Sequence, residues 1–230
     1  MSNKPENTEE STAALKVKKP QKTVTREYAE ALIIALILAL LIRTFIIQAF
    51  KIPTGSMEPT LLVGDHLLVS KFSYSMHVPN EVPFTSIQLF PDYHFFSSVP
   101  KRGDIVVFKF PFEQEKDYIK RVVGLPGETI QVIRQNVYIN DKLLKEPYAH
   151  HTELPSSQVP RDNMPPLRIP EGNIFVMGDN RENSSDSRMW GVLDLKYLRG
   201  KAQWIYWSWD SKDSGFWSVR TDRLGTSVYR

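Results

Sequence analysis

The feature that most constrains this chain is a run of twelve apolar residues from Ala31 to Ile42. The residues after Arg43 extend the run to Phe50. A helix needs about 20 residues to cross a bilayer, and this stretch has that length if the Arg43 side chain reaches an interface. A helix that is apolar on every face is unusual at the edge of a soluble domain. We therefore predict a transmembrane segment over residues 28–50.

The residues before the apolar run are polar, and no acidic residue lies between Ser11 and Arg26. The basic residues of this flank are Lys16, Lys18, Lys19, Lys22 and Arg26. Because positive flanks stay on the cytoplasmic side, the N-terminus should be cytoplasmic and the rest of the chain translocated. A cleavable signal peptide is the alternative, but Gln48-Ala49-Phe50 gives no small-x-small cleavage site. We predict a disordered cytoplasmic tail over residues 1–27 and an uncleaved signal anchor after it.

Composition excludes several classes of function. The formal net charge of +3 is too small to indicate a nucleic-acid partner, and no basic-aromatic recognition motif is present. The chain has no Cys, which excludes thiolate catalysis, Cys-based zinc sites and disulfides. We expect no nucleic acid, metal or cofactor.

After Thr60, short apolar runs alternate with turn residues, as in an all-β protein. The predicted strands are His66–Phe72, Asp104–Phe110, Tyr118–Val123, Thr129–Arg134, Asn136–Ile139 and Lys201–Trp209. No segment after the anchor keeps a 3.6-residue apolar period. The sequence therefore predicts a mostly β, antiparallel domain over residues 51–130 and 173–230. Residues 131–172 are expected to form an inserted β-hairpin subdomain.

Ser56 lies in a turn-forming stretch, Pro53-Thr54-Gly55-Ser56-Met57-Glu58-Pro59, just after the apolar run. A Ser in such a turn is usually a local hydrogen-bonding residue or a helix cap. Its hydroxyl becomes a nucleophile only if a base removes the proton. None of the five His residues belongs to a recognisable Ser-His-Asp pattern, and the Gly-x-Ser-x-Gly elbow is absent.

Lys120 is the better candidate for the base. It lies in a strand-like run from Asp117 to Val123, where a Lys usually faces outward. If it faces inward instead, burial lowers its pKa from about 10.4 toward neutrality. The neutral amine could then act as a base without an imidazole.

The third informative segment, Gly178 to Arg188, is dense in short polar side chains. A calcium loop is the first alternative, but Gly is not at its sixth position and Trp190 stands at its twelfth. A packed polar network fits better, because buried charges need partners. In such a network, Asp179 and Asp186 can pair with Arg121 and Arg188, and a Ser can orient the buried amine.

Together these stretches resemble bacterial type I signal peptidase. The resemblance rests on Phe50–Thr60, Gly64-Asp65, Lys101–Phe108, Asp117–Gly127 and Met177–Arg188, in this order behind an N-terminal anchor. The combination of Ser-Met-x-Pro-Thr with Tyr-Ile-Lys-Arg and Gly-Asp-Asn-Arg is highly specific. A Lys after Tyr-Ile also separates this chain from the endoplasmic-reticulum type, which resembles a Ser/His enzyme.

The resemblance implies roles for individual residues. Ser56 would be the nucleophile and Lys120 the general base, with Ser184 orienting the amine of Lys120. The backbone N–H of Ser56 and the hydroxyl of Thr54 would form the oxyanion hole. Many bacterial members carry Ser at the position of Thr54, and Thr supplies the same donor.

The resemblance also implies structural ion pairs around the dyad and shallow pockets for small P1 and P3 side chains. The ion pairs would be Asp179–Arg121 and Asp186–Arg188. The pocket walls would be Phe50, Ile52, Met57, Leu61, Val107, Tyr118 and Ile119.

The implied function is that of a membrane-anchored serine endopeptidase in the bacterial inner membrane. It would remove signal peptides from translocated preproteins after small-x-small motifs, without metal or cofactor. Its partners would be signal-peptide-bearing preproteins, the lipid bilayer and, nearby, the secretion translocon. The chain would cross the membrane once, with its N-terminus cytoplasmic and its catalytic domain on the outer, periplasmic side.

Two alternatives stay open. One is a specialised Ser/Lys processing protease of related fold; among these, a self-cleaving repressor would carry a DNA-binding helix-turn-helix in place of an anchor. The other is a catalytically silent, membrane-anchored binding protein.

Overall fold

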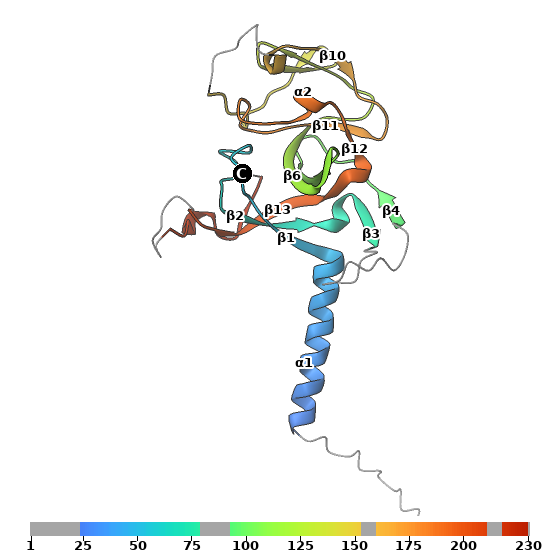
Figure 1. The fold of residues 1–230 in the computed structure, drawn as a ribbon, viewed down its shortest axis with the longest axis vertical. Helices are drawn as coiled ribbons and strands as arrows, with labels where there is room; N and C mark the ends of the chain where they lie inside the picture. The colour runs from blue at the N-terminus through green and yellow to red at the C-terminus, as the bar shows by residue number, and fades with distance from the viewer. Residues whose placement is uncertain (1–23, 79–92, 153–159, 211–217, 230) are drawn as a thin grey trace, which may run out of the picture. The chain divides into compact units, whose positions relative to one another are not determined.

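The computed structural model describes residues 24–78, 93–152, 160–210 and 218–229 (Figure 1). The chain divides into two compact units, Met1–Ala39 and Leu40–Arg230. Most of the predicted cytoplasmic tail lies outside the described residues. Its last four residues are helical, because helix α1 begins at Val24.

Helix α1 (Val24–Leu41) has no buried residue and is followed by a π-helical turn over Ile42–Ile46. None of the helices in the described part of the chain is both long enough and apolar enough to span a membrane. The predicted helical span to Phe50 is wrong at its C-terminal end, because strand β1 begins at Ile47. The backbone of this stretch pairs with β2, and Phe50 lies opposite Leu67.

The main sheet has eight strands, and its described pairings are antiparallel, which confirms the predicted mostly β fold. Its strand order is β1-β2-β13-β5-β6-β11-β12, with β14 paired to β13. In Figure 1, β1, β2 and β13 lie side by side. The strands are β1 (Ile47–Lys51), β2 (Asp65–Ser70), β5 (Ile105–Phe110), β6 (Glu113–Gly124), β11 (Asn173–Met177), β12 (Leu193–Asp194), β13 (Leu198–Ser208) and β14 (Thr226–Ser227).

A second sheet has the order β10-β7-β8-β9 and covers most of the range expected for the inserted subdomain. Its strands are β7 (Thr129–Ile133), β8 (Asn136–Ile139), β9 (Lys142–Leu143) and β10 (Met164–Arg168). Two-residue loops with positive φ at both positions join β7 to β8 and β8 to β9, as expected for tight hairpins. The sheet begins at Thr129, two residues before the expected boundary.

The remaining elements are short. A third sheet pairs β3 (Ser75–Val78) with β4 (Tyr93–Ser97), and α2 is a single turn over Ser187–Trp190. The 3-10 turns are Lys71–Ser73, Pro160–Asp162, Leu195–Tyr197 and Thr221–Arg223. All six strands expected from the sequence are present, within a few residues of their expected ends.

The buried side chains form three clusters, and strand β6 contributes to all of them. Ile119 belongs to the first cluster, Val122 to the second and Val123 to the third. Burying one such side chain contributes about 1.5–3 kcal/mol. The C-terminal half of β6 is therefore held firmly, whereas residues Glu113 to Asp117 are exposed.

Candidate active site

The turn that carries Ser56 joins β1 to β2 and packs through apolar side chains against the first core cluster. Met57 and Leu61 are fully buried in the first core cluster. The Glu58 N–H donates to the Gly55 carbonyl at 3.1 Å, and the Leu61 N–H donates to the Met57 carbonyl at 2.9 Å. This packing keeps Ser56 at 8% exposure.

Lys120 faces inward and meets this turn. Its Nζ donates a hydrogen bond to Ser56 Oγ at 2.7 Å and another to the Ile119 carbonyl at 2.9 Å. The side chain is buried, with 4% of the residue exposed. The sequence left the direction of this side chain open, and the structure brings the two residues of the expected dyad into contact.

The surroundings of Lys120 favour its neutral form. Burial lowers the pKa of Lys120 from 10.5 to about 8, and the Arg188 guanidinium adds to the lowering. The carboxylates of Asp186 and Asp179 act in the opposite direction. At pH 7 roughly one molecule in ten then carries a neutral amine, which can accept the proton of the Ser56 hydroxyl.

Asp179 and Arg121 form a buried bidentate ion pair beside the dyad. Arg121 Nε lies 2.8 Å from Oδ1 and Nη2 lies 2.6 Å from Oδ2 of Asp179, which is fully buried. The Thr60 hydroxyl donates to the same carboxylate at 2.5 Å. Asp179 is thereby bound to the turn that carries the nucleophile as well as to strand β6.

Asp186 and Arg188 form a second bidentate pair. Arg188 Nε lies 2.9 Å from Asp186 Oδ1, and Arg188 Nη2 lies 2.8 Å from Asp186 Oδ2. Burial alone would raise the pKa of Asp186. The Arg188 guanidinium and the hydrogen bond from the Gly178 N–H outweigh this, and the pKa lies below its usual value. Asp186 therefore carries a negative charge that is fully paired.

Neither Ser184 nor Thr54 forms a hydrogen bond with the Lys120 amine, whose hydrogen bonds go to Ser56 and to the Ile119 carbonyl. The Ser184 hydroxyl is buried and forms no hydrogen bond of normal geometry within the described residues, although it is near enough to Asp186 to contribute to its lowered pKa. Thr54 is exposed on the turn. Among the described residues, no hydrogen bond is formed by the Thr54 hydroxyl or donated by the Ser56 N–H.

The seven predicted pocket residues separate into two groups. Six lie in or against the first core cluster: Phe50, Ile52, Met57, Leu61, Val107 and Ile119. Tyr118 packs against the second cluster instead, because it precedes Ile119 on β6 and faces the other side of the strand. Met57 and Leu61 are fully buried. Phe50, which is only partly buried, is thus better placed than these two to contact a substrate.

Asn180 holds the nucleophile turn, and the sequence predicted no such role for it. Its N–H donates to the Ser56 carbonyl at 3.2 Å, and its Nδ2 donates to the Gly55 carbonyl at 3.0 Å. Gly178 permits this close approach, since a Cβ there would collide with the Ser56 carbonyl and the Ser184 hydroxyl. Bonds aimed at backbone carbonyls leave no side-chain pattern from which they could be foreseen.

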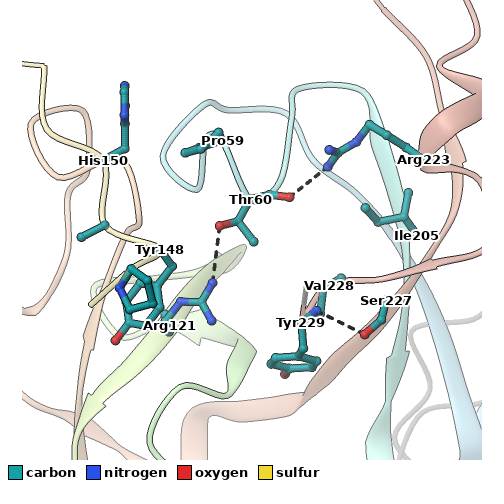
Figure 2. Close-up of a pocket in the computed structure, with 12 residues that line it drawn as sticks. Pro59, Thr60, Arg121, Tyr148, His150, Ile205, Arg223, Ser227, Val228 and Tyr229 are labelled. Carbon is teal, nitrogen blue, oxygen red and sulfur yellow. Dashed lines mark hydrogen bonds between the residues drawn. The ribbon is translucent and has the colours of Figure 1, made fainter. Parts of the chain in front are cut away.

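A cavity of about 530 Å³ is lined by residues that include Arg121 of β6 and Pro59 and Thr60 of the β1–β2 turn (Figure 2). Arg121 lines it, and consecutive strand residues point to opposite faces, so Lys120 faces away from it. Its two arginines, Arg121 and Arg223, are already paired with the buried carboxylates of Asp179 and Asp65. The cavity is therefore separate from the dyad and close to electrically neutral.

Comparison with known proteins gives the family. The model of the family described as "Signal peptidase, peptidase S26" matches residues 25–207. The chain belongs to the signal peptidase family. It is 35% identical over 215 residues to signal peptidase I of Pseudomonas aeruginosa, covering 80% of this chain and 72% of the relative. It is 34% identical to signal peptidase I of Rickettsia typhi over 92% of this chain and 96% of the relative.

A cyanobacterial relative, probable signal peptidase I-1 of Synechocystis, is 37% identical over 77% of this chain and 80% of its own length. Membership of the signal peptidase family makes the chain a peptidase, that is, a hydrolase of peptide bonds.

Proposed function

We propose that this signal peptidase removes N-terminal signal peptides from translocated preproteins with Ser56 as nucleophile and Lys120 as general base. The observation that carries the proposal is the 2.7 Å contact between Ser56 Oγ and the buried Lys120 Nζ, whose pKa burial lowers to about 8. A nucleophile within hydrogen-bond reach of a base of suitable pKa is the geometry that acyl transfer requires.

In the acylation step, the neutral Lys120 amine takes the Ser56 proton as Oγ attacks the scissile carbonyl. The Ser56 N–H and the Thr54 hydroxyl donate to the oxyanion, and losing one such donor typically costs about 10²–10³ in rate. The tetrahedral intermediate expels the amine of the mature protein, which takes the proton from Lys120. Lys120 then activates water, which hydrolyses the ester and releases the signal peptide.

We assign supporting roles to the residues around the dyad. Ser184 would orient the Lys120 amine once substrate excludes water, and the Asp179–Arg121 and Asp186–Arg188 pairs would hold the surrounding loops. Phe50 would form an accessible wall of the pockets that admit small side chains, and Ile119 would lie behind it in the first core cluster. Preference for small-x-small sequences would follow from the limited room in these pockets.

The substrate would lie along the free edge of β6. One edge of β6 pairs with β5. On the other edge, the described partner is β11, which pairs with Arg121 to Gly124 only. Residues Glu113 to Lys120 thus offer backbone groups to an extended peptide, which would add to the sheet as a strand. The scissile bond would then reach Ser56.

Helix α1 is proposed as the membrane anchor. Its side chains from Ala31 onward are apolar, and none of them is buried in protein. The N-terminus would be cytoplasmic, and the unit that carries the dyad would face the outer, periplasmic side of the inner membrane. Its neighbours there would be the bilayer and the secretion translocon that delivers preproteins.

A cleavage assay in detergent tests the function directly. Wild-type protein is expected to cut a preprotein after a small-x-small sequence, with the position read by mass spectrometry. A bulky P1 residue should stop cleavage, because the pockets would have no room for it. Ser56→Ala should be inactive under the same conditions. Cleavage by Ser56→Ala at the wild-type rate would refute the dyad, and binding without cleavage by the wild type would favour a silent binding protein.

The pH dependence of kcat/KM tests the base. Only the neutral Lys120 amine can take the proton, so activity should rise with pH around an apparent pKa of about 8. The rise from pH 7 to pH 9 should be about tenfold. A substrate without ionisable groups near the scissile bond keeps the profile attributable to the enzyme. A profile that is flat from pH 6.5 to 9.5 would contradict Lys120 as the base.

A further inference from the structure

A row of aromatic rings leads away from the dyad along the hairpin of β5 and β6. Lys120 Nζ lies 5.5 Å from the centroid of the Tyr118 ring. Tyr118 stacks on Phe110 with centroids 4.4 Å apart and an interplanar angle of 4°. Phe112 follows at 5.5 Å from Phe110. We call Tyr118, Phe110 and Phe112 the aromatic strip.

The base of the strip is packed and its tip is exposed. The ring of Phe108, which is fully buried, has its centroid 6.2 Å from that of Tyr118, and the Trp190 ring has its centroid 5.9 Å from that of Phe110. The rings of Tyr118 and Phe110 are therefore each packed against a neighbouring aromatic side chain. Phe112, at the turn between the strands, is 71% exposed. A single exposed phenyl ring needs no explanation. This one, however, continues a supported row of rings that begins at the proposed base.

The charges beside the strip do not favour a charged ligand. The exposed residues of β6 include three acidic residues and one Lys, and Glu113 already pairs with that Lys, Lys116. Asp117 has basic neighbours as well, since the charges of Arg199 and Lys109 oppose the rise in its pKa that burial causes. An apolar chain is therefore the better match for the row of rings.

The length of the strip identifies the part of the substrate that would reach it. The three steps from Lys120 Nζ to Phe112 add up to a path of about 15 Å, which is at most four to five residues of extended chain at about 3.3 Å each. A peptide whose scissile carbonyl lies at Ser56 would follow the free edge of β6 in this direction. Its residues five and six positions upstream of the cleavage site would then lie beside Phe112.

We infer that the aromatic strip binds apolar side chains of the leader upstream of the cleavage site, with Phe112 as its outermost contact. The inference rests on the proposed function. The strip selects substrates by the apolar character of the segment that precedes the cleavage motif. It adds a requirement that the small P1 and P3 side chains do not supply.

Three peptides with the same cleavage motif test this. The first ends four residues upstream of the cut, the second continues with four Leu residues, and the third continues with four Ser residues. For the wild type, the Leu extension should raise kcat/KM about tenfold over the short peptide, and the Ser extension should not. Phe112→Ser should lose most of that gain and cut the short peptide at the wild-type rate. Phe72→Ser, which removes a 44% exposed ring outside the strip, should behave as wild type.

Binding provides a second readout that does not require cleavage. In the Ser56→Ala background, fluorescence anisotropy should show about tenfold weaker binding of the Leu-extended peptide after Phe112→Ser. The short peptide should bind equally to both proteins. If Phe112→Ser keeps the gain from the Leu extension, or if Phe72→Ser loses as much, the strip does not bind the leader. A wild type that binds the Leu-extended peptide through Phe112 and yet fails to cleave it would refute the proposed function. The same result would support binding of the leader by the strip.

Discussion

Replacing Lys120 with Met is expected to abolish cleavage and, at the same time, to stabilise the folded protein near neutral pH. Removing a general base typically costs about 10²–10⁴ in rate, because the Ser56 hydroxyl is then left without an acceptor for its proton. Met has nearly the length of Lys, so the change tests the amine with little loss of packing. The loss is measured as kcat/KM on a preprotein with wild type as the reference.

The gain in stability follows from the sign of the pKa shift. Burial places the pKa of Lys120 at about 8 in the folded protein, against 10.5 in the unfolded chain. Below pH 8 the folded state must bury a charged amine at full cost. As pH rises from 8 to 10.5, the folded state holds a neutral amine while the unfolded state still binds a proton, so wild-type stability increases. The cost of keeping the amine at pH 7 is about 3 kcal/mol.

Urea unfolding of both proteins at pH 7 and at pH 10 measures this. Lys120→Met should exceed wild type by about 3 kcal/mol at pH 7, and most of the difference should disappear by pH 10. Lys101→Met, which replaces an exposed Lys, should change little at either pH. A Lys120→Met protein less stable than wild type at pH 7 would show that the amine is not buried as described.

The sequence predicted those strands whose pattern is local, and it missed those defined by distant partners. Strand β1 was read as the end of a helix, because a short apolar run has no period that separates strand from helix. Its strand character comes from pairing with β2, as between Phe50 and Leu67. Strand β11 is buried along most of its length, so it lacks the alternation that marks a half-exposed strand.

The residues of the proposed dyad could be named from the sequence, but their arrangement could not. Ser56 and Lys120 are 64 positions apart, and their 2.7 Å contact depends on how the β1–β2 turn packs against β6. The role of Asn180 depends in the same way on a carbonyl that folding places beside it. Tyr118 could be assigned to a pocket, but its side of the strand was not fixed until the register of β5 and β6 was known.

Replacing Asp179 with Asn is expected to destabilise the protein by about 3–5 kcal/mol, the cost of breaking a buried ion pair from one side. The change leaves the Arg121 guanidinium buried and uncompensated, with only 6% of its side chain exposed. Urea unfolding at pH 7 measures the loss. The matched control is Asp194→Asn, which breaks a surface pair with Lys196 at 3.0 Å and should cost less than about 1 kcal/mol. Equal losses of unfolding free energy in the two variants would contradict the buried, ion-paired state of Asp179.

The double variant Asp179→Leu with Arg121→Met separates the structural role of the pair from its electrostatic effect on the dyad. Removing both charges together should cost less stability than Asp179→Asn alone, since no charge is left buried without a partner. The Asp179 carboxylate raises the pKa of Lys120 against the dominant effect of burial. Its loss should therefore shift the rise of kcat/KM with pH to lower pH. If the rise stayed at the pH found for the wild type, the Asp179 carboxylate would affect the dyad only through the stability of the fold.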